Sequence, residues 1–392
     1  MSPNRPFAVV LFIVSILFTS HVSAQDEEKN WELNGYLKTL QTFNFISGFD
    51  SVLFDNLVHN RLNFKWYVHP NLTIYAEARN RLFYGDLVRA IPNYGDIIED
   101  QGSFLNLSLN IIEGRSMILN TTLDRFYFEW IKDDWEVRLG KQRINWGVNL
   151  AWNPNDIFNA YSFFDFDYEE RPGTDGIRIK KYYGFASSLE LASNFVTDLD
   201  DWSIAGLWKW NKWNYDMQLL AGKAREDLVL GLGWAGNIKG AGFKGEATWF
   251  KPYSDVEENN FESLLLSMSW DYSFKNTLYI HGSFLVNTGI KGDTESFLLS
   301  NLNFEQLGVK ELLPYQYSIF LQSSFSFSPL VSGSLSAMTF PGDRAIFINP
   351  ALTISLEDNL DFDAIGQIFH SEENDEMGAT ARLLYFRLKW SF

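Results

Sequence analysis

The final segment of the chain alternates strictly between apolar and polar positions. One face carries only apolar side chains, at Leu384, Phe386, Leu388, Trp390 and Phe392. The other face carries Tyr385, Arg387, Lys389 and Ser391. A period of two residues is that of a β-strand whose two faces meet different surroundings. The segment is therefore predicted to be a strand with one wholly apolar face.

The same alternation recurs in eight pairs of segments, each pair joined by a short turn. The turns are predicted at His69–Asn71, Asp133–Asp134, Tyr182–Gly184, Asn211–Lys212, Asn237–Gly240, Ser273–Asn276, Ser328–Pro329 and Glu357–Asn359. One further strand near Trp31–Phe43 and the final strand bring the eight hairpins to 18 strands, with 16 as the alternative count.

An even number of strands, with both chain ends on the side of the short turns, is the arrangement of single-chain bacterial outer-membrane barrels. Aromatic residues also gather beside the short turns, as in the girdle at a membrane boundary. They are Trp66, Trp130, Trp135, Trp210, Trp213, Trp234, Trp270 and Tyr272. The predicted fold class is all-β: a transmembrane antiparallel up-and-down β-barrel with short periplasmic turns and long extracellular loops. A soluble β-sandwich is the alternative.

The first 24 residues have the pattern of a secretory signal peptide. Arg5 is the only charged residue before Ala24, and Phe7–Thr19 is an apolar run too short to span a bilayer comfortably. No later run of 18 apolar residues follows. Residues 1–24 are therefore predicted to be a signal peptide, and 25–392 a single barrel domain in the outer membrane of a Gram-negative bacterium.

Composition excludes several function classes. A net charge of −17 argues against a nucleic-acid partner, which needs a basic footprint. The absence of cysteine excludes disulfides, thiol nucleophiles and cysteine-ligated metals. The histidines show no metal-ligand spacing, and His281 and Ser283 have no evident orienting acid. We therefore predict no cofactor, no metal site and no enzymatic activity.

The strand face opposite the apolar one would line the interior of a barrel. Its predicted pore-lining residues are Glu77, Arg79, Arg81, Arg125, Glu129, Glu136, Arg138, Gln142, Arg178, Lys180 and Glu190. Later strands place small hydroxyl residues there instead, including Ser267, Ser269, Ser318, Ser324, Ser332, Ser334 and Ser336. Lys141 and Arg143 break the pattern, because they share the parity of Leu139. They would lie above the apolar band, or a bulge would reverse the alternation.

Two interpretations of the charged face remain open. A barrel of 16–18 strands is wide enough for an aqueous lumen, and a charged lining selects solutes by the sign of their charge. The same arginines and glutamates could instead pair across strands and simply hold the wall together.

An ordered set of short motifs lies between residues 138 and 178. It consists of Arg138–Gln142, Asn145–Gly147, Asn153–Asp156 and Arg171–Gly173, followed by Asp175, Gly176 and Arg178. The set resembles a region of alginate-export-type and related porin-like outer-membrane proteins. That resemblance implies an 18-stranded porin or exporter for acidic polysaccharide or apolar compounds. It covers roughly a tenth of the chain, and the arginine ladder here is diluted by glutamates.

Two loops are too long and too apolar to be left in solvent. Val148–Asp175 is predicted to pack into the barrel mouth as a constriction, with Trp152, Pro154, Asp156, Phe164, Tyr168 and Pro172 as its candidate residues. Asp86–Thr121 would do the same or dock on a partner protein.

The predicted function is that of a porin-like channel that passes hydrophilic solutes, anionic or saccharide ones among them, through a charged lumen. The alternative is a structural or assembly partner with a plugged lumen in an outer-membrane complex. Phe386, Leu388, Trp390 and Phe392 resemble the C-terminal signal that the barrel-assembly machinery reads. Further predicted partners are outer-membrane lipid, lipopolysaccharide, and other envelope proteins or copies of this chain.

Overall fold

The computed structural model describes residues 29–46, 51–99, 103–159, 173–253, 261–290, 309–311, 315–342, 345–373 and 376–392. The predicted signal peptide lies outside these residues. No helix in the described ranges is long and apolar enough to cross a membrane.

The strands follow one another along the whole chain. They are β1 (Trp31–Ile46), β2 (Ser51–His69), β3 (Leu72–Gly85), β4 (Ser108–Glu113), β5 (Met117–Lys132), β6 (Trp135–Gln142), β7 (Thr174–Tyr182), β8 (Ser188–Asn194), β9 (Ile204–Lys212), β10 (Tyr215–Ala224), β11 (Asp227–Ile238), β12 (Ala241–Pro252), β13 (Ser263–Ser273), β14 (Tyr279–Asn287), β15 (Tyr317–Ser328), β16 (Val331–Phe340), β17 (Ala345–Glu357), β18 (Leu360–Glu373) and β19 (Glu376–Ser391). The helices are α2 (Asp86–Ala90), α3 (Tyr94–Ile98), η1 (Leu199–Asp201) and η2 (Val309–Glu311).

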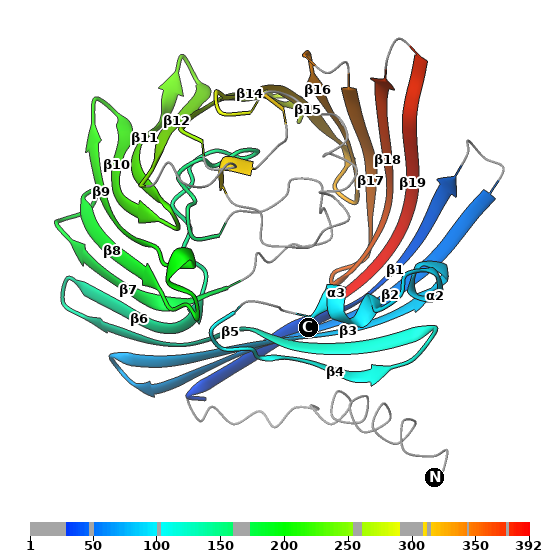
Figure 1. The fold of residues 1–392 in the computed structure, drawn as a ribbon, viewed down its shortest axis with the longest axis horizontal. Coiled ribbons are helices and arrows are strands. Elements are labelled where there is room, and N and C mark those ends of the chain that lie inside the picture. The colour runs from blue at the N-terminus through cyan, green and yellow to red at the C-terminus, as the bar shows by residue number, and fades with distance from the viewer. Residues whose placement is uncertain are drawn as a thin grey trace.

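The strands close into a ring, which Figure 1 shows from one end. Apart from β4, each strand pairs antiparallel with the next, so that β3 pairs directly with β5, and β19 pairs with β1. Because β4 only adds to one edge of β5, the closed wall has 18 strands, the number predicted from the sequence. The predicted fold class is confirmed.

The eight short turns fall where the alternation predicts them or within a few residues. One displaced turn is in the β9–β10 hairpin, predicted to turn at Asn211–Lys212. It turns at Trp213 and Asn214, with φ angles of 57° and 61°. Two successive positive φ angles are typical of the type I′ turn that suits a tight hairpin. A tryptophan there hid the turn, since such positions usually hold Gly, Asn or Asp.

The outer surface of the wall is apolar and its inner surface is not. Exposed tryptophans and aliphatic residues occupy the outward positions, among them Trp66, Trp130, Leu139, Leu230, Trp270 and Leu388. Lys38, Arg61 and Glu246 lie on the opposite face and are fully buried. This inside-out distribution suits a barrel in lipid, because a Lys or Arg on the lipid face costs roughly 2–4 kcal/mol near the bilayer midplane.

Residues 143–159, the described part of the chain after β6, lie inside the ring and appear as a teal loop in Figure 1; they are called the inward segment below. Ile144, Trp146 and Trp152 of this segment are almost completely buried. They pack against inward-facing apolar residues such as Leu207, Leu220 and Phe320. The barrel interior therefore contains a packed core on one side.

The second long loop is built differently from the prediction. Within Asp86–Thr121, Ser108–Glu113 forms β4. This strand pairs with residues 118–122 of β5, on the same edge where β6 pairs only with residues 126–132. Leu109 and Ile111 point outward and are exposed, whereas Ser108 bonds to Thr122 on the inner side. This part of the loop therefore extends the wall and does not cross the barrel mouth.

Candidate functional site: the charged wall and the inward segment

The charged residues of the inner wall form two chains of ion pairs. In the first, Arg61 bridges Glu77 at 2.5 Å and Asp124 at 2.6 Å. Arg79 binds the other oxygen of Asp124 at 3.0 Å, and Arg125 binds Glu77 at 3.1 Å. Four cross-strand contacts thus join β2, β3 and β5 into one network.

The second chain continues across β5 to β8. The Nε atom of Arg138 lies 2.6 Å from Glu129 and 3.0 Å from Glu136. Arg178 binds Glu136 at 2.6 Å and lies 3.5 Å from Glu190. The hydroxyls of Tyr75 and Tyr182 donate to Glu129 and Glu136, so these carboxylates are held by both charge and hydrogen bonds.

Three predicted pore-lining residues lie outside these pairs. Arg81 donates to the backbone oxygen of Ile98 at 2.9 Å and to Asn120 at 3.0 Å. The Lys180 ammonium lies 4.6 Å from the centre of the Tyr182 ring. Gln142 is fully buried and donates to the backbone oxygen of Gly176, so its side chain does not face open space.

The pairing does not hide both partners equally. The Arg138 side chain keeps 26% of its surface exposed, whereas Glu129 and Glu136 each keep 7%. Arg178 is also more exposed than Glu136. In the second chain the guanidinium groups of Arg138 and Arg178 are therefore more exposed than their carboxylate partners, whereas in the first chain Arg61 is nearly shielded and Glu77 keeps 15% of its surface exposed.

Sequence reasoning missed Lys38, His59, Arg61 and Asp124, which are all buried in this wall. Strict alternation from Leu62 would have placed Arg61 and His59 inside. Asp124 gave no such signal, because it shares parity with the outward Phe126. A bulge opposite Glu77 and Ala78 reverses the alternation at Asp124 and turns its side chain inward.

Lys141 has the parity of the outward residue Leu139, and the sequence analysis placed it either above the apolar band or beside a bulge. The structure shows a third arrangement. The Lys141 side chain is buried within the wall, where Nζ donates to Ser103 at 2.7 Å and lies 3.6 Å from Asp175. Leu105 donates its backbone N–H to the same carboxylate, so the chain leading into β4 covers this ion pair. Arg143 lies beyond the end of β6.

Glu246 on β12 anchors the inward segment. Its carboxylate accepts backbone hydrogen bonds from Val148 at 2.6 Å, Asn149 at 3.1 Å and Asn155 at 2.8 Å. Glu246 is fully buried, and the sequence analysis did not select it. Its alternation with the outward Trp249 and Ala247 would have placed it inside the barrel.

Side chains of the segment complete the attachment to the wall. Asn155 bonds to Thr248 and Leu232, and Asn149 bonds to Ser267 and Ser269. A separate set links Trp146 to the charged wall, since its indole N–H donates to Glu190, which also contacts Arg178. The segment and the arginine wall are therefore physically continuous.

The predicted constriction residues fall into two groups. Trp152, Pro154 and Asp156 lie inside the barrel and are buried. Asp156 accepts the backbone N–H of Trp146, so its carboxylate holds the segment in shape and does not face open space. Phe164, Tyr168 and Pro172 lie outside the described residues.

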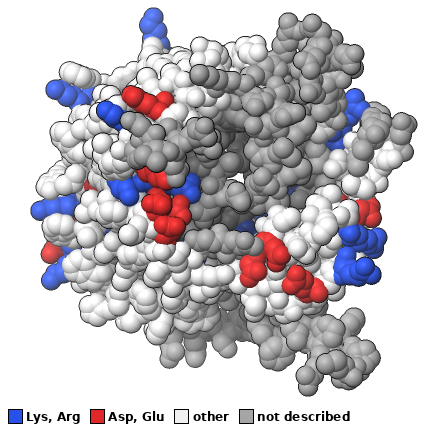
Figure 2. All heavy atoms as spheres, viewed as in Figure 1, with Lys and Arg blue, Asp and Glu red and all other residues white. Residues whose placement is uncertain are grey.

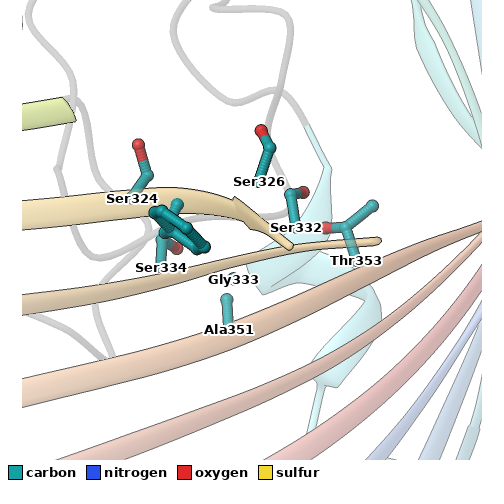
Figure 3. Close-up of a pocket in the computed structure, with 8 residues that line it drawn as sticks. Ser324, Ser326, Ser332, Gly333, Ser334, Ala351 and Thr353 are labelled. Atoms are coloured by element: carbon teal, nitrogen blue, oxygen red, sulfur yellow. The ribbon is translucent and has the colours of Figure 1, made fainter. Parts of the chain in front are cut away.

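The wall formed by β15, β16 and β17 has a different chemistry. A recess of about 270 Å³ lies against Ser324, Ser326, Ser332, Ser334, Ala351 and Thr353. Figure 3 shows these small hydroxyl side chains on three neighbouring strands. The barrel thus carries a charged wall on its early strands and a hydroxyl-rich one on its later strands.

No catalytic relay is visible at His281 and Ser283. Within the described ranges, neither ring nitrogen of His281 has a hydrogen-bond partner, and the ring packs near Phe320. Among the same residues, no group of three or more His, Asp or Glu side chains is placed to hold a metal ion.

The similarities of the chain are structural. No protein-family model matches it, and no curated protein matches it significantly. The crystal structure of OccAB3 from Acinetobacter baumannii matches with a TM-score of 0.62 at 10% identity, over 93% of this chain and 99% of that one. A BenF-like porin from Pseudomonas fluorescens Pf-5 matches with a TM-score of 0.60 at 8% sequence identity, over the same shares of the two chains. The outer membrane protein opdK from Pseudomonas aeruginosa matches with a TM-score of 0.59 at 8% sequence identity, again over 93% of this chain and 99% of that one.

These neighbours agree with the porin-like part of the resemblance found in the sequence. They do not single out the alginate-export type. At such low identities the likeness concerns the fold. The chain is thus a closed 18-stranded antiparallel β-barrel with the fold of outer-membrane porins.

Proposed function

We propose that this barrel is a channel in the outer membrane of a Gram-negative bacterium and that it passes small hydrophilic solutes by diffusion. The observation that carries the proposal is the inner wall, where the Arg138 side chain stays partly exposed above buried carboxylates. Charged side chains that keep contact with water inside a barrel mark an aqueous path. The shared fold with porins supports the same conclusion.

The charge distribution favours solutes with an anionic group. Arg138 and Arg178, which are more exposed than their partners, set the local potential, while carboxylates at the outer loops are screened within about 8 Å at physiological salt. Each arginine also holds the wall through its ion pair, so we expect a mild preference. The proposal therefore combines the two interpretations of the charged face.

The hydroxyl-rich wall supports solutes that also carry hydroxyl groups, such as acidic saccharides. Ser324, Ser332 and Thr353 offer donors and acceptors close to a recess in that wall. The resemblance of the 138–178 region to alginate-export-type proteins points to the same class. Alginate itself is a weaker candidate, because glutamates neutralise much of the ladder here.

Planar-bilayer recording tests the channel directly. Purified wild-type protein should give stable single-channel steps, and reversal potentials in a KCl gradient should favour chloride. Replacing Arg138 with Gln removes the exposed charge and should shift the reversal potential toward cation preference. The matched control is Arg225→Gln, which removes an exposed arginine from the β10–β11 turn, where it pairs with Asp201. An equal shift in both variants would contradict the assignment.

The packed core inside the barrel favours a second candidate function. Trp146 and Trp152 fill part of the interior, and a barrel plugged in this way can serve as a structural partner for other envelope proteins. Reconstituted protein that inserts into bilayers but never conducts would favour this function over the channel.

A further inference from the structure

A row of outward-facing residues near the short turns combines cations with aromatic rings. Lys132 on β5 lies opposite Trp135 on β6, and Trp135 lies opposite Lys181 on β7. Directly opposed residues in an antiparallel pair point to the same side of the sheet. The two lysines therefore flank one tryptophan on the outer surface, with backbones roughly 10 Å apart, which is two strand spacings.

This row marks the boundary of the apolar band. The next row toward the middle of the wall is wholly apolar and contains Trp130, Val137, Ile179 and Leu191. Continuing the lysine row along the wall leads to Leu189 and Trp208, which are both exposed. The lysines thus lie where the hydrocarbon of a membrane would end and its headgroups begin.

Aromatic rings hold the Lys181 ammonium in place. Its nitrogen lies 4.9 Å from the centre of the Trp135 ring and 5.3 Å from that of the exposed Tyr183. An ammonium between two rings still has N–H groups to donate. Neither Lys132 nor Lys181 forms an ion pair with a carboxylate within the described parts of the chain.

From this geometry we infer that Lys132, Trp135 and Lys181 form a binding site for the phosphate of an anionic phospholipid in the leaflet beside the short turns. The lysines would contact the headgroup, Trp135 and Tyr183 would lie at the level of the glycerol, and the apolar row below would contact the acyl chains. The inference rests on the proposed membrane location but does not depend on the solute.

The positive charge of this site contrasts with the net negative charge of the whole chain. A net charge of −17 repels anionic lipid in general, so unpaired lysines at one headgroup level localise the attraction. A single Lys near an anionic membrane surface contributes about 1 kcal/mol, or roughly fivefold in affinity. Two of them should therefore give roughly 30-fold.

Native mass spectrometry of the full chain in mild detergent tests the inference, with dioleoyl phosphatidylglycerol and dioleoyl phosphatidylcholine as probes. Wild type should bind the first phosphatidylglycerol tighter than phosphatidylcholine. The Lys132→Gln/Lys181→Gln variant should bind phosphatidylglycerol roughly 30-fold more weakly and phosphatidylcholine unchanged. The control Lys239→Gln/Lys275→Gln removes two lysines from other short turns, β11–β12 and β13–β14, and should leave both affinities unchanged.

Equal affinity of wild type for the two lipids would overturn the inference, and so would an equal loss in the control variant. The single variants Lys132→Gln and Lys181→Gln keep the test decisive if the double variant does not fold, since each should lose about fivefold. Channel recordings of the same proteins separate this result from the proposed function. Lipid preference without conductance would reject the channel and retain the lipid site.

Discussion

Asp124 shows how single residues keep charge inside the barrel. Its two oxygens bind Arg61 and Arg79 at 2.6 and 3.0 Å, and both guanidinium groups are nearly shielded from solvent. Removing one member of a buried ion pair leaves the other charge without compensation, which costs roughly 3–5 kcal/mol. The bulge that points Asp124 inward is therefore a structural requirement of the arginines on β2 and β3.

We predict that Asp124→Asn lowers the free energy of unfolding by about 3–5 kcal/mol, because the amide cannot neutralise two buried arginines. Urea unfolding of the protein in lipid vesicles measures this value. The control Asp201→Asn breaks the exposed pair with Arg225 and should cost less than about 1 kcal/mol. Similar losses in the two variants would show that burial does not set the strength of the Asp124 contacts.

Alternation placed part of the interior charges and failed at particular residues for physical reasons. Arg138 and Glu136 follow a regular strand, and the structure brings them together with Glu129 and Arg178. Asp124 and Lys141 depend on a bulge and on a covering segment that strand periodicity does not encode. The spacing of residues along one strand cannot predict a contact with a residue that is distant in the sequence.

Among the elements, the inward segment between β6 and β7 depends most on one residue. Glu246 accepts three backbone N–H groups of the segment. Within the described residues those of Val148 and Asn155 have no other partner, whereas Asn149 also donates its N–H to the side chain of Asn153 at 2.9 Å. Each buried donor without a partner costs roughly 1–3 kcal/mol. Glu246 is thus a positioning residue that fixes the segment against β12.

We predict that Glu246→Ala leaves an assembled barrel whose inward segment is loosened. Single-channel recordings should show increased open-channel noise and a higher mean conductance. Glu246→Gln keeps one acceptor oxygen and should give an intermediate result. Glu262→Gln serves as the control, since Glu262 is bound to the indole of the outer residue Trp249. Quiet channels of wild-type conductance in Glu246→Ala would show that the segment does not narrow the path.

Element boundaries were predictable wherever local chemistry set them. The turns at Asp133–Asp134 and Glu357–Asn359 contain ordinary turn residues, and the structure turns there. β4 was not predicted, because Ser108–Glu113 pairs with a strand edge that becomes available only when β6 ends early. The inward direction of the Val148 loop followed from its apolar composition, but its anchors come from strands about 90 residues later in the chain.

At the scale of the whole molecule, the inward segment and the arginine wall lie on different sides of the barrel. The inward segment packs against strands between β8 and β15, whereas the arginine wall lies on β2 to β7. Figure 2 shows acidic and basic side chains around the rim of one end, with mostly uncharged surface between them. Glu190 contacts both, since it accepts the indole N–H of Trp146 and lies 3.5 Å from Arg178.

Barrel closure joins the two ends of the chain and gives the last prediction. Phe392 and Gly35 exchange two backbone hydrogen bonds, of 2.9 and 3.0 Å, beside the pairing of β19 with β1. A side chain at Gly35 would collide with the backbone oxygen of Arg61. Deleting Phe392 removes both hydrogen bonds and the aromatic ring, whereas Phe392→Ser removes only the ring.

If the barrel-assembly machinery reads the terminal ring, both variants should show lowered levels of heat-modifiable protein in the outer membrane of cells. Refolding into detergent micelles without that machinery should separate them. Phe392→Ser should refold like wild type, because its backbone still closes the seam, and the deletion should refold more slowly or less completely. A Phe392→Ser protein that assembles normally in cells would show that the ring is not a signal. A Phe392→Ser protein that fails both in cells and in micelles would show that the ring acts by packing beside Trp390. The centres of the two rings lie 5.1 Å apart.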